Sequence, residues 1–264
     1  MTTKHFTLTA LLLCVVAIPP RDVHADENDT INFLFGESVS RDNNVFRVPD
    51  ASAPAADTIS SAFIGIQVRK PVSQQNFELE ATRSATRYRH LTNQDFESTA
   101  YRSHWDWRIT SRFSGNLSAD RTESLAPFEE SGITQRNVRI SENRGLNLDV
   151  WLKGGWHLNA GVSRSRQKSE LSVQRIPDSI EDAGTLGMTF ISRANNSASF
   201  SLRTVRGEYL SSFSSVAPGG SGGFRQNESI FNVKWSPGAK STLNGQVAWL
   251  DRNNDDVVLA DFSG

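Results

Sequence analysis

Apolar and polar residues alternate along most of the chain, and residues 101–113, YRSHWDWRITSRF, show the pattern most clearly. The odd positions carry aromatic, aliphatic or small side chains, whereas the even positions carry ionisable residues and one threonine. A period of two residues is typical of a β-strand whose two faces meet different surroundings. Globular strands are usually about five or six residues long. The stretch therefore predicts an unusually long strand with one apolar and one polar face.

Alternating segments of this kind recur as hairpins along the whole chain. Short turn-like stretches occur near Pro71, Arg112, Gly155, Asn195 and Gly238, at spacings of 41, 43, 40 and 43 residues. Each turn is flanked by alternating segments of about ten residues, the unit expected of a repeated hairpin. Longer polar stretches separate one hairpin from the next. They include residues 41–58, 122–143, 167–184 and 211–226.

Short turns at one end of the strands and long loops at the other are the pattern of an outer-membrane β-barrel. We count about twelve strands and predict an all-β fold, an antiparallel transmembrane barrel built from repeated hairpins. A soluble β-sandwich would also alternate, but its strands would be shorter and its apolar face less aromatic. Trp156 and Trp235 at the short turns and Trp249 near a long loop fit the aromatic belts of such a barrel.

On several strands the apolar face ends at an arginine, as at Arg83, Arg121 and Arg164. An arginine at the bilayer midplane would cost about 2–4 kcal/mol. Three interpretations stay open: a β-bulge that reverses the two faces, a strand that has already risen above the membrane, or an arginine near the outer head groups that meets anionic lipid phosphate.

The first residues predict export. Lys4 precedes an apolar run over 6–18, and the small residues Val23 and Ala25 frame a cleavage site. The run is too short to span a bilayer, which takes about 20 apolar residues. We therefore expect residues 1–25 to be a cleaved signal peptide and 26–264 to form the barrel domain.

Composition narrows the class of protein further. The chain has 28 Lys plus Arg against 29 Asp plus Glu, which argues against a nucleic-acid partner. The one cysteine, Cys14, belongs to the predicted signal, so the mature chain would have no disulfide and no thiol chemistry. No later segment is apolar over the length of a transmembrane helix, so a membrane-inserted form would have to be a closed barrel.

The mature start, INFLFG at 31–36 followed by RDNNVFRVPD at 41–50, resembles the opening of EpsL-type proteins. These are outer-membrane barrels encoded in exosortase-linked exopolysaccharide operons. The segment WDW at 105–107 and SGNLSADR at 114–121 resembles the same family, and the resemblance covers nearly all of the mature chain. The last residues, 260–264, depart from it because they lack the final aromatic residue usual in such barrels, which fits a truncated chain.

The resemblance implies a bacterial outer-membrane barrel that serves the synthesis or export of extracellular polysaccharide, and it brings no catalytic residues. The partners it implies are outer-membrane lipid and lipopolysaccharide, the exopolysaccharide, and other polysaccharide-export proteins. Mixed charges and amides facing inward would hydrogen-bond sugar hydroxyls, or would simply solvate a water-filled interior. The candidate lumen-lining residues are Glu78, Glu80, Arg102, His104, Asp106, Arg108, Asn232 and Lys234.

Catalytic patterns are weak. Residues 219–223, GGSGG, match the string G-x-S-x-G but lack the preceding strand and following helix of a nucleophile elbow, so we interpret them as a flexible loop tip. His90, His104 and His157 show no metal-ligand spacing. We predict a non-enzymatic barrel without cofactor or metal that passes or assists polymer. The alternatives are a general diffusion porin, a barrel-embedded polysaccharide-modifying enzyme, and a scaffold for export partners.

Overall fold

The computed structural model describes residues 29–49, 53–128, 134–171, 178–210, 222–238, 241–255 and 262–263. The predicted signal peptide lies outside the described residues. Among the residues described, no helix is long and apolar enough to cross a membrane.

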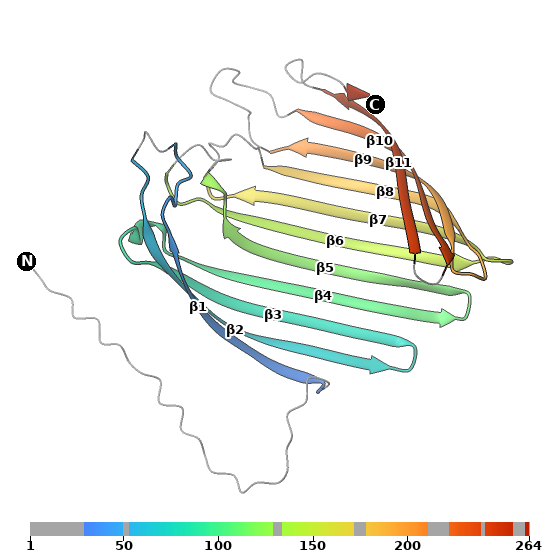
Figure 1. Cartoon of the computed structure of the whole chain (residues 1–264), viewed down its shortest axis with the longest axis horizontal. Helices are drawn as coiled ribbons and strands as arrows, with labels where there is room; N and C mark the ends of the chain where they lie inside the picture. The colour runs from blue at the N-terminus through green and yellow to red at the C-terminus, as the bar shows by residue number, and fades with distance from the viewer. Residues whose placement is uncertain are drawn as a thin grey trace, which may run out of the picture.

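The described chain is all-β and forms one antiparallel sheet of twelve strands in sequence order, from β1 to β12 (Figure 1). Each strand pairs with the strands before and after it in the chain, as repeated hairpins require. The predicted all-β fold of antiparallel, repeated hairpins and the count of about twelve strands are thus confirmed. The elements are β1 (Ile31–Asp42), β2 (Asp57–Val72), β3 (Gln75–Tyr88), the 3-10 helix η2 (Thr92–Gln94), β4 (Phe96–Thr110), β5 (Phe113–Leu125), β6 (Val138–Trp151), β7 (Trp156–Ser169), β8 (Ser179–Ile191), β9 (Ser197–Tyr209), β10 (Gly223–Gly238), β11 (Ser241–Asn254) and β12 (Phe262–Ser263).

The alternation of the sequence becomes a sheet with an apolar and a polar face. Because strand side chains point to opposite faces in turn, the register places the apolar residues of neighbouring strands side by side. Phe77 stacks on Trp105, with ring centroids 5.4 Å apart, and Trp156 lies 5.1 Å from Phe190. This apolar face is open to its surroundings, since Phe35, for example, is 84% exposed. Large exposed apolar patches mark surfaces that meet a membrane or another protein.

The predicted short turns are confirmed where the structure describes them. Ser73 between β2 and β3, Asn195 between β8 and β9, and Gly154 and Gly155 between β6 and β7 all have positive φ, which a tight reversal favours. The turn between β10 and β11 includes residues 239–240, which lie outside the described part.

The predicted loop boundaries and strand lengths are wrong in a consistent way. Strands β1 to β11 span 12 to 16 residues instead of about ten. Strand β5, for example, continues to Leu125 and β6 begins at Val138, so both ends of the predicted loop 122–143 are strand. The cause is that charged residues replace apolar ones on the outward face near the long loops while the backbone stays extended. The long connection around η2, between β3 and β4, adds a fifth to the four polar stretches named from the sequence.

The bulge interpretation of the outward arginines is also wrong. The pairing of β3 with β4 continues in register through Arg83, and the same holds for β5 with β6 at Arg121 and β7 with β8 at Arg164. The two register shifts recorded among the described strands lie at Arg108–Thr110 and Trp235–Gly238, both beside short turns. The arginines therefore stay on the same face as the apolar residues before them.

The strands are staggered in the manner of a sheared sheet. A row of directly paired residues runs from Gln75, the first residue of β3, to Trp249 in β11, eight strands further on. Trp249 lies eight residues beyond Ser241, the first residue of β11. At about 3.4 Å per residue and about 4.8 Å per strand, the strands tilt by about 35°, within the range of closed barrels. The intervening residues are Trp107, Gly115, Leu148, Ala160, Leu186, Leu202 and Ser229.

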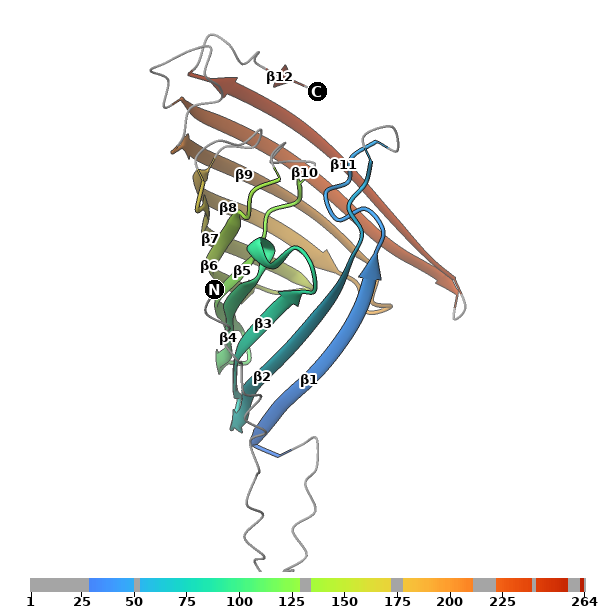
Figure 2. The ribbon, with the colours of Figure 1, turned by 90° about the vertical axis from the view of Figure 1, so that its left-hand side faces the viewer.

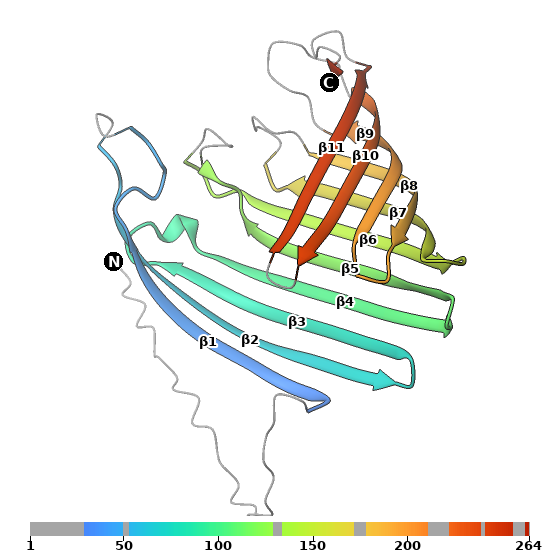
Figure 3. The same ribbon diagram turned by 45° about the vertical axis from the view of Figure 1, so that its right-hand side comes forward.

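The sheet curls strongly, and β10 and β11 run at a steep angle to β1–β4 (Figures 2 and 3). Within the described residues it does not close: β1 pairs only with β2, and β11 carries the two-residue β12 at the opposite edge.

Buried side chains gather near the long loops. Phe46, in the loop after β1, meets the edge of Phe128, after β5, with ring centroids 4.9 Å apart. Gln94 in η2 is fully buried and donates from Nε2 to the Thr134 carbonyl at 2.7 Å. These contacts tie the long connections together into a folded rim.

Candidate functional site

The eight predicted lumen-lining residues all occupy the polar face, because they share the even positions of β3, β4 and β10. Two separate groups result. Six residues lie together on β3 and β4, whereas Asn232 and Lys234 lie on β10, six strands away in the sheet order. The structure therefore brings the first six into one region but does not unite them with the other two.

The group on β3 and β4 is a patchwork of opposite charges. Glu78 accepts a hydrogen bond from Arg69 Nε at 3.1 Å, and Glu80 pairs directly with Arg102 across the strands. On β4, His104 Nε2 lies 2.8 Å from Asp106 Oδ1. Each carboxylate thus has a cationic or ionisable neighbour, so this surface presents no large potential of one sign.

A ladder of amides and hydroxyls crosses the same face over β5–β8, and the sequence analysis missed it. Asn147 Nδ2 donates to Asn116 Oδ1 at 3.0 Å, and Thr189 Oγ1 donates to Asn159 Oδ1 at 2.7 Å. Between them, Asp149 Oδ2 accepts from Asn159 Nδ2 at 2.6 Å. The signal that could have found the ladder was the same alternation, which places these residues between apolar neighbours.

This ladder lines a hollow of about 990 Å³ near the short turns. Asp106 and Arg108 reach the hollow, together with hydroxyls of β8 and β9, whereas the other predicted residues do not line it. Most of the polar groups around it are uncharged amides and hydroxyls. The polar face is therefore the concave face of the curled sheet, and it can offer many hydrogen bonds to a neutral, hydroxyl-rich molecule. The polar side chains that line the hollow include Asp106, Arg108, Asn116, Asn147, Asp149, Asn159, Thr189, Ser199 and Ser201.

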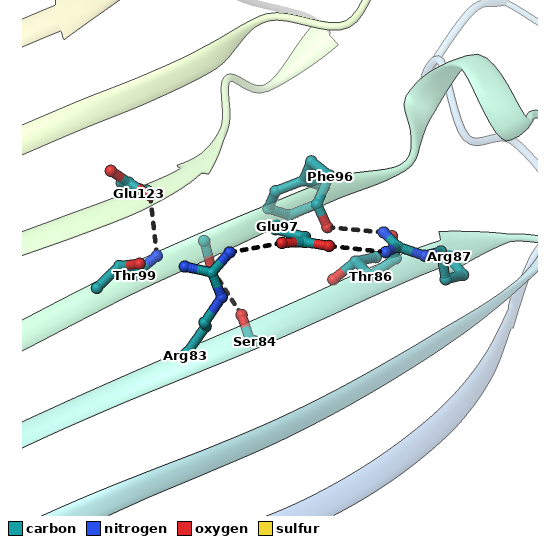
Figure 4. Close-up of polar contacts among 9 residues, drawn as sticks. Arg83, Ser84, Thr86, Arg87, Phe96, Glu97, Thr99 and Glu123 are labelled. Atoms are coloured by element: carbon teal, nitrogen blue, oxygen red, sulfur yellow. Dashed lines mark hydrogen bonds and ion pairs between the residues drawn. The ribbon is translucent and has the colours of Figure 1, made fainter. Parts of the chain in front are cut away.

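The convex face changes character near the long loops, where ion pairs replace apolar side chains. Glu97, next to the start of β4, accepts from Arg83 at 2.7 Å and from Arg87 at 3.1 Å (Figure 4). The hydrogen bond from Arg83, and after it the hydrogen bond from Arg87, hold the pKa of Glu97 below its usual range. Arg164 binds Asp182 through two bonds of 2.6 and 2.7 Å.

At the long-loop rim, Asp57 anchors the connection between β3 and β4. Its carboxylate is shielded from solvent and accepts backbone N–H bonds from Leu91 at 2.7 Å, His90 at 2.9 Å and Thr58 at 2.7 Å. Burial alone would raise the pKa of Asp57. The three N–H donors outweigh burial and hold the pKa far below its usual 3.8.

No group of three or more His, Cys, Asp or Glu residues within the described ranges has the geometry of a metal site. The G-x-S-x-G string falls mostly on residues outside the described part; its last residue, Gly223, opens β10. Comparison of the chain with family models, with curated proteins and with solved structures gave no match.

Proposed function

We propose that this chain is a non-enzymatic outer-membrane barrel that helps exopolysaccharide cross the bacterial outer membrane. The observation that carries the proposal is the pairing of an exposed apolar convex face with a polar concave face. That division runs across strands β1–β11, of which β3–β11 are tilted by about 35°. In this arrangement the convex face meets hydrocarbon and the concave face meets water.

Closure of the wall is part of the proposal. A sheet edge left open in hydrocarbon would hold unpaired backbone N–H and C=O groups, each costing several kcal/mol. The edges at β1 and β11 therefore become paired in the membrane.

The lumen chemistry supports a sugar-based cargo. Amides such as Asn116, Asn147 and Asn159 both donate and accept, so they can match sugar hydroxyls in more than one orientation. Neighbouring opposite charges, as at Glu80 and Arg102, keep the lumen from retaining ions of one sign. The resemblance of the mature start to EpsL-type proteins supports exopolysaccharide as the particular polymer.

A general diffusion porin is the second candidate, favoured by a specific observation. On the concave face of β4–β9 the register places aromatic side chains only near the strand ends, at Phe96, Trp151 and Tyr209. The central lumen thus offers hydrogen bonds without rings on which sugars could stack. A passive pore for small solutes needs no more than this.

The test combines secretion with conductance. Deletion of the gene should reduce secreted polymer, and the purified chain in planar bilayers should form channels that added exopolysaccharide blocks. Replacing the ladder by Asn147→Leu with Asn159→Leu should weaken polymer block, whereas the convex-face change Leu186→Val should not. Two results together would favour the diffusion porin over the proposed function. They are normal polymer secretion after deletion of the gene and a channel conductance that added exopolysaccharide does not change.

A further inference from the structure

A row of arginines crosses the convex face on β6–β10, where the apolar band ends. Direct cross-strand pairing links Arg144 with Arg164, Arg164 with Asp182, Asp182 with Arg206, and Arg206 with Arg225. All five side chains are exposed. Like charges directly opposite each other destabilise a sheet, and this row contains two such pairs. A bound anion would relieve that repulsion.

Protein carboxylates only partly neutralise the row. Asp182 is committed to Arg164, and Glu142, beside the row, binds Arg121 at 3.4 Å. Within the described ranges, no ion pair forms at the other basic groups in or next to the row. The nearby carboxylates of Glu208 and Asp255 form none either, although Asp255 lines a hollow together with Arg206 and Arg225. Those basic groups are Arg144, Arg166, Arg206 and Arg225.

An apolar groove adjoins the row on its short-turn side. Leu146, Val162, Gly184 and Thr204 form the next row of paired residues. With the leucines below them they line a groove of about 500 Å³. Gly184 leaves it open, because a Cβ added there would meet nothing within 4 Å. Such a groove matches an acyl chain that lies against the strands and ends beneath the arginines.

The height of the row fits a membrane boundary. Arg164 lies eight residues beyond Trp156, the first residue of β7 at the short-turn end. At about 3.4 Å per residue and a tilt of about 35°, the row stands about 22 Å above that end. The apolar band of a membrane barrel is about 25 Å tall. Head-group phosphates would therefore lie level with the arginines.

We propose that this convex surface of β6–β10 binds a glycolipid whose head group carries two phosphates, of the lipid A class. One phosphate binds at Arg144 and Arg166, the other at Arg206 and Arg225, and an acyl chain occupies the groove at Gly184. The Arg164–Asp182 pair separates the two cationic groups. Arg144 and Arg206 are three strands apart, about 14 Å, a span that a single phosphate cannot bridge. The inference rests on the membrane placement in the proposed function.

The test measures lipid A binding to the full, detergent-solubilised chain by native mass spectrometry. Arg144→Gln with Arg206→Gln should weaken binding at least tenfold, and Gly184→Leu should weaken it several-fold. The matched controls remove the same charge on the concave face, Arg108→Gln with Lys234→Gln, or fill an equally open convex glycine, Gly245→Leu. Both controls should leave lipid A affinity unchanged.

Three outcomes would overturn the inference. The first is full lipid A binding by the double arginine variant when its circular dichroism shows an intact sheet. The second is equal affinity for phosphatidylglycerol, which would mean that one phosphate suffices. The third is displacement of lipid A by millimolar inorganic phosphate, which would mean that the acyl groove contributes nothing. Conductance and polymer block of the variants are measured separately. Lipid A binding without polymer transport would contradict the proposed function and leave the lipid site standing.

Discussion

Asp57 shows how one side chain fixes a loop at the rim of the sheet. Three backbone N–H groups converge on its carboxylate from β2 and from the connection between β3 and β4. No apolar pattern marks this connection in the sequence, and so its folded form was not foreseen. Asp57 itself lies within 41–58, a stretch that the sequence predicts as a loop.

The pKa of Asp57 predicts how this rim responds to acid. A carboxylate whose folded pKa is lowered stabilises the fold fully above its unfolded pKa, about 3.8, and loses that effect as the pH falls through the folded value. Protection of the His90 and Leu91 amides, measured by hydrogen exchange and corrected for the intrinsic rate, should stay constant from pH 7 to pH 4. It should fall only below that range.

The variant Asp57→Asn provides the control for this prediction. It keeps the shape of the side chain but removes the charge that the N–H groups solvate. Protection at His90 and Leu91 should drop several-fold at neutral pH, and the acid-dependent loss should vanish. Unchanged protection in the variant would show that another contact holds the connection.

At the scale of single elements, the hairpins were predictable and their limits were not. The short turns near Pro71 and Asn195 follow from local residue types, because few residues accept the backbone that a tight reversal needs. The strand ends are different. Glu123 and Glu142 look like loop residues in sequence, yet they belong to β5 and β6 and pair across these two strands. Only the neighbouring strand, which supplies their ladder hydrogen bonds, determines that they stay extended.

The turn between β8 and β9 offers a test at this scale. Asn195 has φ 58°, a left-handed conformation that a β-branched residue adopts at a cost of about 1–2 kcal/mol. Asn195→Val should therefore lower the free energy of unfolding in lipid vesicles, followed by tryptophan fluorescence in urea, whereas Asn195→Gly should be close to neutral. An equally stable valine variant would mean that this turn does not hold the positive φ.

The sequence predicts the charged part of the candidate site but not its amide ladder, for a similar reason. Charged residues on β3 and β4 stand out in the sequence, and the structure places them on the polar face. The amide ladder at Asn116, Asn147 and Asn159 does not stand out, because single asparagines are common in loops. It becomes a surface only when the register aligns three strands. The hollow that it lines belongs to the curvature of the whole sheet.

At the scale of the whole molecule, the account depends on which surroundings each face meets. The alternation, the tilt of about 35° and the outward arginines fit the proposed arrangement, with hydrocarbon against the convex face and water inside. Pairing along the chain is local, but the tilt accumulates over many strands. No single hairpin of the sequence could therefore have revealed it.

The most direct measurement is a cysteine scan along β7 in the mature chain reconstituted in lipid vesicles, where the predicted removal of Cys14 leaves no background thiol. Labels at Leu158, Ala160 and Val162 should be quenched by lipid-soluble nitroxide and should resist a water-soluble thiol reagent. Labels at His157, Asn159 and Gly161 should behave in the opposite way, and from Arg164 onward both sets should react with the aqueous reagent. Equal aqueous reactivity at all positions from 157 to 162 would contradict the account.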